Sequence, residues 1–456
     1  MLHLGDYIYE YGNEPRDGTG PTATGDRYGP VELQRVRDHK PGTETVSLQD
    51  YRVRHALYKT DPDLQAAHER HPWIVIFDDH EITNDAYDTG AENHEQQDDP
   101  DTSYTGAGEP AGVRAEGEFL ARRADAFRAY LEWMPIREPQ TYQSEPHTGT
   151  QFFRRFTFGD LAELSVVETR QNRSRQEPTT VGTPPVRVNP ALADPSRHLP
   201  EPAQLSWLTE GVTSGRTAWH LIGNQTVFTR VFTIPQARPV PGQVFNADQW
   251  DGYQADQSAL LAAMAASGRT DPVVLTGDIH SSWSNDLPTD YDAYRRGDRS
   301  SSVGVEFVCP SITSDGFKEV LQGSAATATA VTGFFRAANP WVRYLEGIGH
   351  GFAVLDVTPQ RVQTDFFFIR SGGDKGLTTD PRLDPQATVG YETSFQSLKG
   401  SRQVSGPVAQ LGARSDEPRA ARPSPRGRDR DDDRDDDRAD DRGQGRDRDD
   451  ARAAFL

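Results

Sequence analysis

The sequence has a single cysteine, Cys309, among 456 residues. One cysteine cannot form a disulfide within a copy of the chain, and it cannot build a cysteine-rich zinc site, so both are excluded for a monomer. Cys309 ends an apolar run at 303–309, which is typical of a core position rather than a reactive thiol. The chemistry of this protein must therefore come from oxygen and nitrogen side chains.

Long apolar runs and excess positive charge are also lacking. No stretch approaches the roughly 18 to 20 apolar residues needed to cross a bilayer, so no transmembrane segment is expected. No signal peptide is recognisable, because residue 1 leads directly into a structured motif. The formal net charge is −20, and a nucleic-acid-binding surface would need a basic stripe. We therefore predict no nucleic-acid partner.

The end of the chain has almost no apolar side chains. Residues 428–452 consist largely of Arg and Asp in alternating blocks, so the segment is rich in charge but nearly neutral. Such a segment cannot bury enough apolar surface to offset its ordering entropy. We predict a disordered tail at 405–456 and a catalytic domain at 1–404.

The body reads as one mixed α/β unit. Short apolar runs at 73–77, 218–222 and 273–275 each end at polar, potentially reactive residues. Continuous runs of this kind predict strands in a sheet that is covered on both faces. Ligands of such folds bind beyond the strand ends, so the polar residues there are the first candidates for a site.

Further elements follow from periodicity and turn signals. An apolar stripe predicts a helix over 116–134 that ends at Pro135, and an Ala- and Leu-rich segment predicts another over 257–266. A hairpin is expected over 152–158 and 161–167. Later strands are expected at 303–308, 352–357 and 362–369, and long loops at 13–45, 88–114 and 174–203.

Three predicted strand ends carry side chains of the types that commonly bind metals. The candidates are Asp6 and Tyr9, then Asp78, Asp79 and His80, then Asp278 and His280. Carboxylate, phenolate and imidazole together suit iron, manganese or zinc and, with more oxygen donors, calcium. Two cations about 3.5 to 4 Å apart can share one carboxylate and act on a phosphate ester. Taken singly, 78–81 could instead be an acidic helix start, and 5–10 an edge strand with ordinary tyrosines.

In combination these motifs resemble the PhoD-type alkaline phosphatases, a branch of the calcineurin-like metallophosphoesterases. The matching stretches are spread over almost the whole body of the chain. They are His-Leu-Gly-Asp-Tyr-Ile-Tyr-Glu (3–10), Phe-Asp-Asp-His-Glu (77–81), Gly-Ala-Glu-Asn-His (90–94), Tyr-Leu-Glu-Trp-Met-Pro-Ile-Arg (130–137), Trp-Asp-Gly-Tyr (250–253), Leu-Thr-Gly-Asp-Ile-His (275–280), Glu-Phe-Val-Cys-Pro-Ser-Ile-Thr-Ser (306–314) and His-Gly-Phe (350–352).

The resemblance implies an α/β fold with a metallophosphoesterase-type β-sandwich flanked by helices, in four layers (α/β/β/α). It implies that Asp6 bridges two metals, that Tyr9 binds iron and that His80 is a general acid or contacts phosphate. The remaining metal-site residues would be Asp78 and Asp79 on the side of the second metal, His280 as a ligand and Asp278 beside it.

The same resemblance implies Fe3+ with Ca2+ as cofactors, and phosphate monoesters or diesters as substrates. Family members are typically exported folded through the twin-arginine route, so an extracellular or cell-wall location is expected. The family also has an upstream β-sandwich-like domain and a strand that donates a thiolate near a Ser-Cys-Gln stretch. Both would precede residue 1, and Cys309 is no substitute, so one ligand and one strand are expected to be missing.

This expectation leaves an alternative function open, a truncated, weakly active or inactive metal-binding fragment. Other residues are open as well. Arg170, in the stretch 166–173, could bind phosphate or form a structural ion pair, and Arg173 lies nearby. Asn224 and His350 could approach the site or stabilise a loop.

Overall fold

The structure is a computed structural model, which describes residues 1–12, 38–94, 116–183, 186–233, 242–321, 324–370 and 387–412. The Arg- and Asp-rich segment expected to be disordered lies outside these residues from 413 onward. Most of the expected loops at 13–45 and 88–114 also lies outside them.

The largest sheet has seven strands in the order β11-β9-β10-β8-β7-β4-β3. The four inner strands β10, β8, β7 and β4 are parallel, and the outer strands are antiparallel to their neighbours. The hairpin expected at 152–167 is confirmed as β3 and β4. The strands are β3 Arg154–Phe158, β4 Ala162–Val166, β7 Trp219–Asn224, β8 Asp271–Thr276, β9 Ser282–Pro288, β10 Ser302–Val308 and β11 Val342–Glu346.

A second, antiparallel sheet packs against one face of the first. It comprises β12 Gly351–Val357, β13 Arg361–Arg370, β14 Thr388–Leu398 and β15 Val404–Ser405. Leu221 and Val273 of the large sheet share a core with Phe366 of the second sheet. Their chain neighbours Ile222 and Val274 point the other way, into a core with α4 and α5. The large sheet is therefore covered on both faces, as its continuous apolar runs predict.

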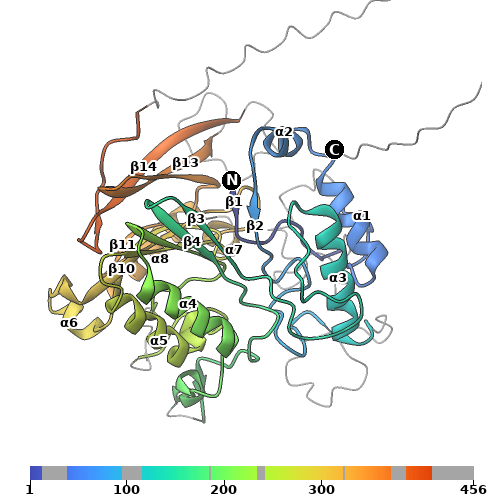
Figure 1. Cartoon of the computed structure of the whole chain (residues 1–456), viewed down its shortest axis with the longest axis horizontal. Helices are drawn as coiled ribbons and strands as arrows, with labels where there is room; N and C mark the ends of the chain where they lie inside the picture. The colour runs from blue at the N-terminus through green and yellow to red at the C-terminus, as the bar shows by residue number, and fades with distance from the viewer. Residues whose placement is uncertain are drawn as a thin grey trace, which may run out of the picture. The chain divides into compact units, whose positions relative to one another are not determined.

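Helices complete the mixed α/β architecture (Figure 1). Helices α4 and α5 cover the large sheet, while α1 and α3 pack beside β1 and β2. Within the described ranges, no helix combines the length and the apolar character needed to span a bilayer. The helices are α1 Leu48–Tyr58, α2 Pro62–Arg70, α3 Phe119–Trp133, α4 Pro202–Ser214, α5 Gln254–Ala265, α6 Tyr291–Arg295, α7 Phe317–Val320 and α8 Ala325–Ala338.

The first strand of the chain forms a small parallel sheet. Strand β1 (Leu2–His3) pairs with β2 (Ile74–Val75), and each strand is only two residues long. The apolar run 73–77 thus forms a shorter strand than expected. The reason lies in β1, because the chain leaves the strand direction at Gly5 (φ 116°) and Asp6 (φ 58°). This turn carries Asp6 away from the sheet edge and into the site.

The end of the body extends beyond the expected boundary at residue 404. Strand β15 pairs with β14 across this boundary. The backbone N–H of Val408 then donates to the carbonyl of Ser394, and that of Leu411 donates to the Asp365 carboxylate. Residues 405–411 therefore lie on the second sheet.

Candidate metal centre

The site begins where the loops after β1 and β2 touch. A Cβ added to Gly5 would lie 2.3 Å from the Asp78 Cβ, so the two backbones meet at a distance that only glycine allows. Glu81 holds the same junction, because its carboxylate accepts the backbone N–H groups of Asp6 (3.0 Å), Tyr7 (2.5 Å) and Asp78 (2.9 Å). One buried side chain thus fixes two loops that are distant in sequence.

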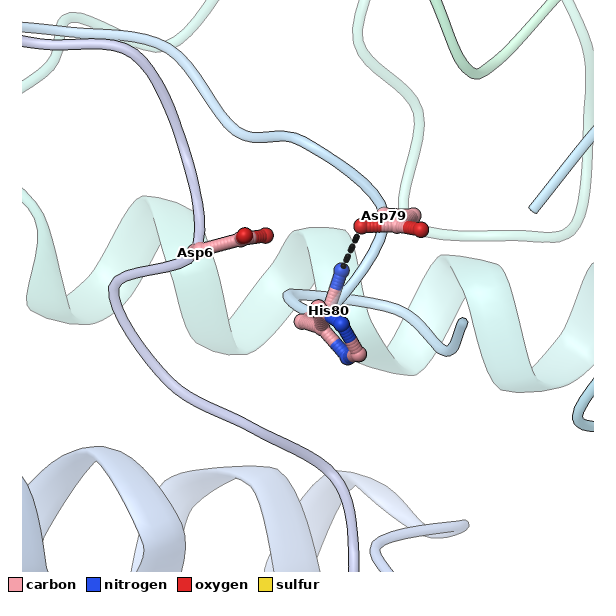
Figure 2. A group of neighbouring side chains, drawn as sticks. All are labelled: Asp6, Asp79 and His80. Carbon is pink, nitrogen blue, oxygen red and sulfur yellow. Dashed lines mark hydrogen bonds between the residues drawn. The ribbon is translucent and has the colours of Figure 1, made fainter. Parts of the chain in front are cut away.

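This junction brings three ligand atoms together. Asp6, Asp79 and His80 each offer one atom, and these atoms lie within 4.8 Å of one another. Figure 2 shows the Asp6 and Asp79 carboxylates facing each other, with the His80 ring beside them. The backbone N–H of His80 donates to the Asp79 carboxylate at 2.9 Å, which fixes that side chain.

Tyr9 and His280 complete this side of the site. The Tyr9 hydroxyl donates to Asp6 Oδ2 at 3.1 Å and lies 2.9 Å from His280 Nε2. His280 Nδ1 is 2.7 Å from the carbonyl oxygen of Asp315. A carbonyl can only accept, so Nδ1 carries a proton, and in the neutral ring Nε2 presents its lone pair toward Asp6 and Tyr9.

The acceptor atoms of this cluster indicate that it suits a cation. The Tyr9 oxygen, His280 Nε2 and Asp6 Oδ2 lie within 3.4 Å of one another. The other Asp6 oxygen, Oδ1, is buried and has no hydrogen-bond partner among the described residues. A buried carboxylate oxygen without a donor is costly in a protein, and a metal ion would satisfy it.

His80 is held by a buried acid. Its Nδ1 lies 2.7 Å from Glu10 Oε2, and its ring stacks on Tyr9 with 4.1 Å between centroids. Glu10 is fully buried and also accepts from Thr83, Asn84 and Asn93. Burial alone would lower the pKa of His80, but Glu10 and the neighbouring aspartates raise it well above its usual value. Glu10 thus fixes one ring nitrogen of His80 beside the cluster.

Arg170 lies at the centre of a second group of carboxylates. Its guanidinium contacts Asp78 (2.5 Å), Asp248 (3.0 Å), Asp278 (3.1 Å) and Asp79 (3.6 Å). The side chain is fully buried, and each of its three nitrogens donates to a carboxylate. Of the two interpretations left open for Arg170, these contacts support the structural ion pair.

Two carboxylates of this group have raised pKa values. Burial, opposed by Arg170 and reinforced by Asp79 and Asp6, raises the pKa of Asp78 to about 7. Burial and the neighbouring carboxylates also raise the pKa of Asp278 well above its usual value. Arg173 also pairs with Asp248, so two guanidiniums face four carboxylates, of which three are buried and Asp278 is half-buried. The remaining negative charge means that this side of the site also suits a cation.

Two ligand-bearing segments have left-handed backbone. Asp6 (φ 58°), Asp278 (φ 64°) and His280 (φ 49°) all adopt positive φ angles, which are uncommon for residues other than glycine. Each such residue costs on the order of 1 kcal/mol or more and persists where the surroundings impose it. The strain is concentrated where the candidate ligands converge.

The structure also places residues that the sequence motifs left without a role. Glu10 holds His80, and Asp248 pairs with both Arg170 and Arg173. Glu10 could have been found as a buried acid inside the first motif. Asp248 lies in a polar loop at 242–249 that gives no such signal.

Asn224 and His350 do not join the cluster. Asn224 accepts from the Trp250 indole at 2.9 Å, and His350 pairs with Glu319 at 3.6 Å. These contacts support a structural role for both residues, which is the second of the two interpretations left open by the sequence.

Comparison with known proteins agrees with these motifs. The model of the PhoD-like phosphatase family matches residues 1–366. Alkaline phosphatase D of Bacillus subtilis (strain 168) is 32% identical over 423 residues, which is 91% of this chain and 61% of that protein. A solved structure of PhoD matches with a TM-score of 0.67 and 29% identity, covering 90% of this chain and 66% of that one. The chain thus spans about three fifths of its curated relative, and it belongs to the PhoD-like phosphatase family.

Proposed function

We propose that this chain is a metal-dependent phosphohydrolase that cleaves phosphate monoesters and diesters. The observation that carries the proposal is the convergence of Asp6, Tyr9, Asp79 and His280 beside His80, whose ring is held by Glu10. Family membership supports the same reaction class.

We propose Fe3+ and Ca2+ as the cofactors. Asp6, Tyr9 and His280 form the group that would hold iron, since phenolate and imidazole suit a transition metal. Asp78, Asp79 and Asp278 would hold calcium, which prefers oxygen ligands. The chemistry that bound cations supply is neutralisation of phosphate charge and a lowered pKa of water.

The residues of the chain supply position and protons. His80 is proposed to give a proton to the oxygen of the leaving group, because its pKa is raised and its ring is fixed by Glu10 and Tyr9. Arg170 is proposed to hold Asp78 and Asp278 in place rather than to reach the substrate, because its nitrogens are already engaged. Export through the twin-arginine route is proposed on the family resemblance, and cell fractionation tests it.

The test uses the purified full chain supplied with iron and calcium. Release of p-nitrophenol from p-nitrophenyl phosphate and from bis-p-nitrophenyl phosphate is followed, and Asp6→Asn is expected to lose activity at least about 100-fold. The matched control is Asp292→Asn, which alters a carboxylate whose side chain is 76% exposed. Full activity in Asp6→Asn would overturn the mechanism, and tight metal binding without turnover by the unmodified chain would support the fragment alternative.

A further inference from the structure

One peptide group links His280 to a second acid. Its carbonyl, from Asp315, accepts from His280 Nδ1 at 2.7 Å. Its N–H, from Gly316, donates to Glu319 Oε2 at 3.0 Å. In a trans peptide the C=O and N–H point in opposite directions, so His280 and Glu319 contact the two ends of one planar dipole.

The contact between this turn and His280 is close. A Cβ on Gly316 would lie 2.7 Å from the carbonyl oxygen of His280, so a side chain there would push the turn away from its target. The turn follows β10, whose parallel neighbour β8 precedes Asp278 and His280. Adjacent strand ends thus supply both the histidine and the group that holds it.

A buried histidine lies behind Glu319. This histidine is His350, and its Nε2 lies 3.6 Å from Glu319 Oε2. Both side chains are 3% exposed. The other ring nitrogen lies 3.3 Å from the Ser311 hydroxyl, which itself donates to the carbonyl of Ser314 at 2.6 Å. Ser311 and Gly316 thus connect His350 and Glu319 to the same 311–316 loop that carries Asp315.

We propose that Glu319, supported by His350, is a positioning residue for His280 that acts through the peptide group between Asp315 and Gly316. The negative carboxylate polarises this group and strengthens its carbonyl as an acceptor. A stronger acceptor keeps the proton on His280 Nδ1 and so keeps the Nε2 lone pair directed at Asp6 and Tyr9. Acids that orient a ligating histidine in this way tune its affinity for a metal.

The inference rests on the proposed function only in treating His280 as a metal ligand, so its test has readouts that do not require turnover. The full-length chain carries 15N-labelled histidine, and the ring signals of His280 are identified by their loss in His280→Gln. Long-range 1H–15N spectra of metal-free protein then report which ring nitrogen bears the proton. Binding of Mn2+ alone is measured by the electron paramagnetic resonance of the free ion.

Three variants and one control separate the contributions. Glu319→Ala removes both the charge and the acceptor for Gly316, whereas Glu319→Gln keeps an acceptor, and His350→Gln removes the partner of the acid. The control is Asp256→Asn, because Asp256 also holds a backbone N–H (Leu199, 2.9 Å) and a histidine (His198, 3.2 Å). Neither Asp256 nor His198 hydrogen-bonds to His280 in the described part of the chain.

We expect Glu319→Ala to shift the proton of His280 toward Nε2 and to weaken Mn2+ binding about tenfold. Glu319→Gln and His350→Gln should give smaller changes in the same direction, and Asp256→Asn should give neither. Unchanged His280 signals and Mn2+ affinity in folded Glu319→Ala would overturn the inference. If that variant does not fold, unchanged values in Glu319→Gln would do so.

Turnover by the unmodified chain is scored separately. With phosphatase activity present, the inference further requires that kcat fall more than KM rises in Glu319→Ala. With activity absent, the proposed function fails, while the His280 spectrum and the Mn2+ affinity still decide the role of Glu319.

Discussion

At the residue scale, the defining arrangement is an acid, a histidine and a tyrosine that restrain one another. Glu10 fixes Nδ1 of His80, and the ring of Tyr9 covers one face of the imidazole. Tyr9 in turn contacts Asp6 and His280 through its hydroxyl. A change at any of these residues should therefore also alter the positions of the candidate ligands Asp6 and His280.

Replacing His80 by Asn should affect substrates unequally. If His80 protonates the leaving group, its loss should cost about 100-fold or more for phenyl phosphate, whose leaving group is a poor one. For p-nitrophenyl phosphate the loss should be much smaller, because that leaving group departs without protonation. The measurement is kcat for both esters, with exposed His71→Asn as the control. Equal losses for the two esters would contradict the general-acid role.

Glu10 should make stability depend on pH. Burial would raise its pKa, but His80 and the hydrogen bonds from Asn84 and Asn93 lower it to about 2, against 4.5 in an unfolded chain. Between these values the unfolded state binds more protons. The stabilisation is therefore complete above about pH 4.5 and is lost as the pH falls toward 2, and its size is about 3 kcal/mol.

Urea unfolding of Glu10→Gln and the unmodified protein, measured from pH 6 down to pH 3, checks this expectation. The difference in the free energy of unfolding should shrink as the pH falls. Exposed Glu138→Gln serves as the control and should show a constant, small difference. A difference that does not vary with pH would contradict the assigned role of Glu10.

The ligand types were predictable from the sequence, but their partners were not. Asp6, Asp79, His80 and His280 stand at strand ends in recognisable motifs, and the structure brings these four together. Whether Arg170 faces substrate or protein depends on Asp248, which comes from a distant polar loop. Contacts of this kind depend on tertiary placement, which periodicity and spacing do not encode.

At the scale of elements, the junction between β1 and β2 determines the site. Gly5→Ala should be severely destabilising, because its Cβ would overlap Asp78 and its φ of 116° is unfavourable for alanine. The matched control is Gly159→Ala. Gly159 also has a positive φ, of 58°, but an added Cβ there meets nothing within 4 Å.

Denaturant unfolding compares the two alanine variants. Gly159→Ala should lower the free energy of unfolding by about 1 to 2 kcal/mol, because only the unfavourable backbone conformation contributes there. Gly5→Ala should lower it by at least about 3 kcal/mol. Similar costs at the two positions would show that the close approach of the loops contributes little.

The sequence predicted the existence of strands and helices with strong apolar patterns well. It predicted their first and last residues less accurately. The strand expected at 73–77 is shorter because its partner β1 ends where the chain turns at Gly5. The helix expected from residue 116 begins at Phe119. At the strand, the apolar run continues beyond the backbone pairing, because burial and pairing are separate requirements. At the helix, residues 116–118 are Glu-Gly-Glu and Gly117 has a positive φ of 80°, so the helix begins only after them.

At the scale of the whole molecule, the C-terminal boundary can be tested by two deletions. Removing residues 413–456 should leave kcat and the melting temperature unchanged, because the described contacts of the body end at Leu411. Removing residues 405–456 should lower the melting temperature by several degrees. That deletion takes away the Val408 and Leu411 backbone contacts to β14 and β13.

Thermal unfolding and p-nitrophenyl phosphate turnover of both truncated chains give the answer. An equal melting temperature for the two would mean that residues 405–412 add nothing to the body. Lost activity in the shorter deletion would assign the Arg- and Asp-rich segment a part in catalysis.

The hydrogen bonds between Glu81 and the backbone of Asp6, Tyr7 and Asp78 also bear on the order in which the site forms during translation. The bond between Glu81 and Asp6 spans 75 residues, whereas the contact between His280 and Asp6 spans 274. On the ribosome, the segments that carry Asp6, Asp79 and His80 can meet while much of the chain is still to be translated. His280 emerges far later, so an ion captured early would be held by an incomplete ligand set. Delivery of the metal is therefore best matched to the end of translation rather than its beginning.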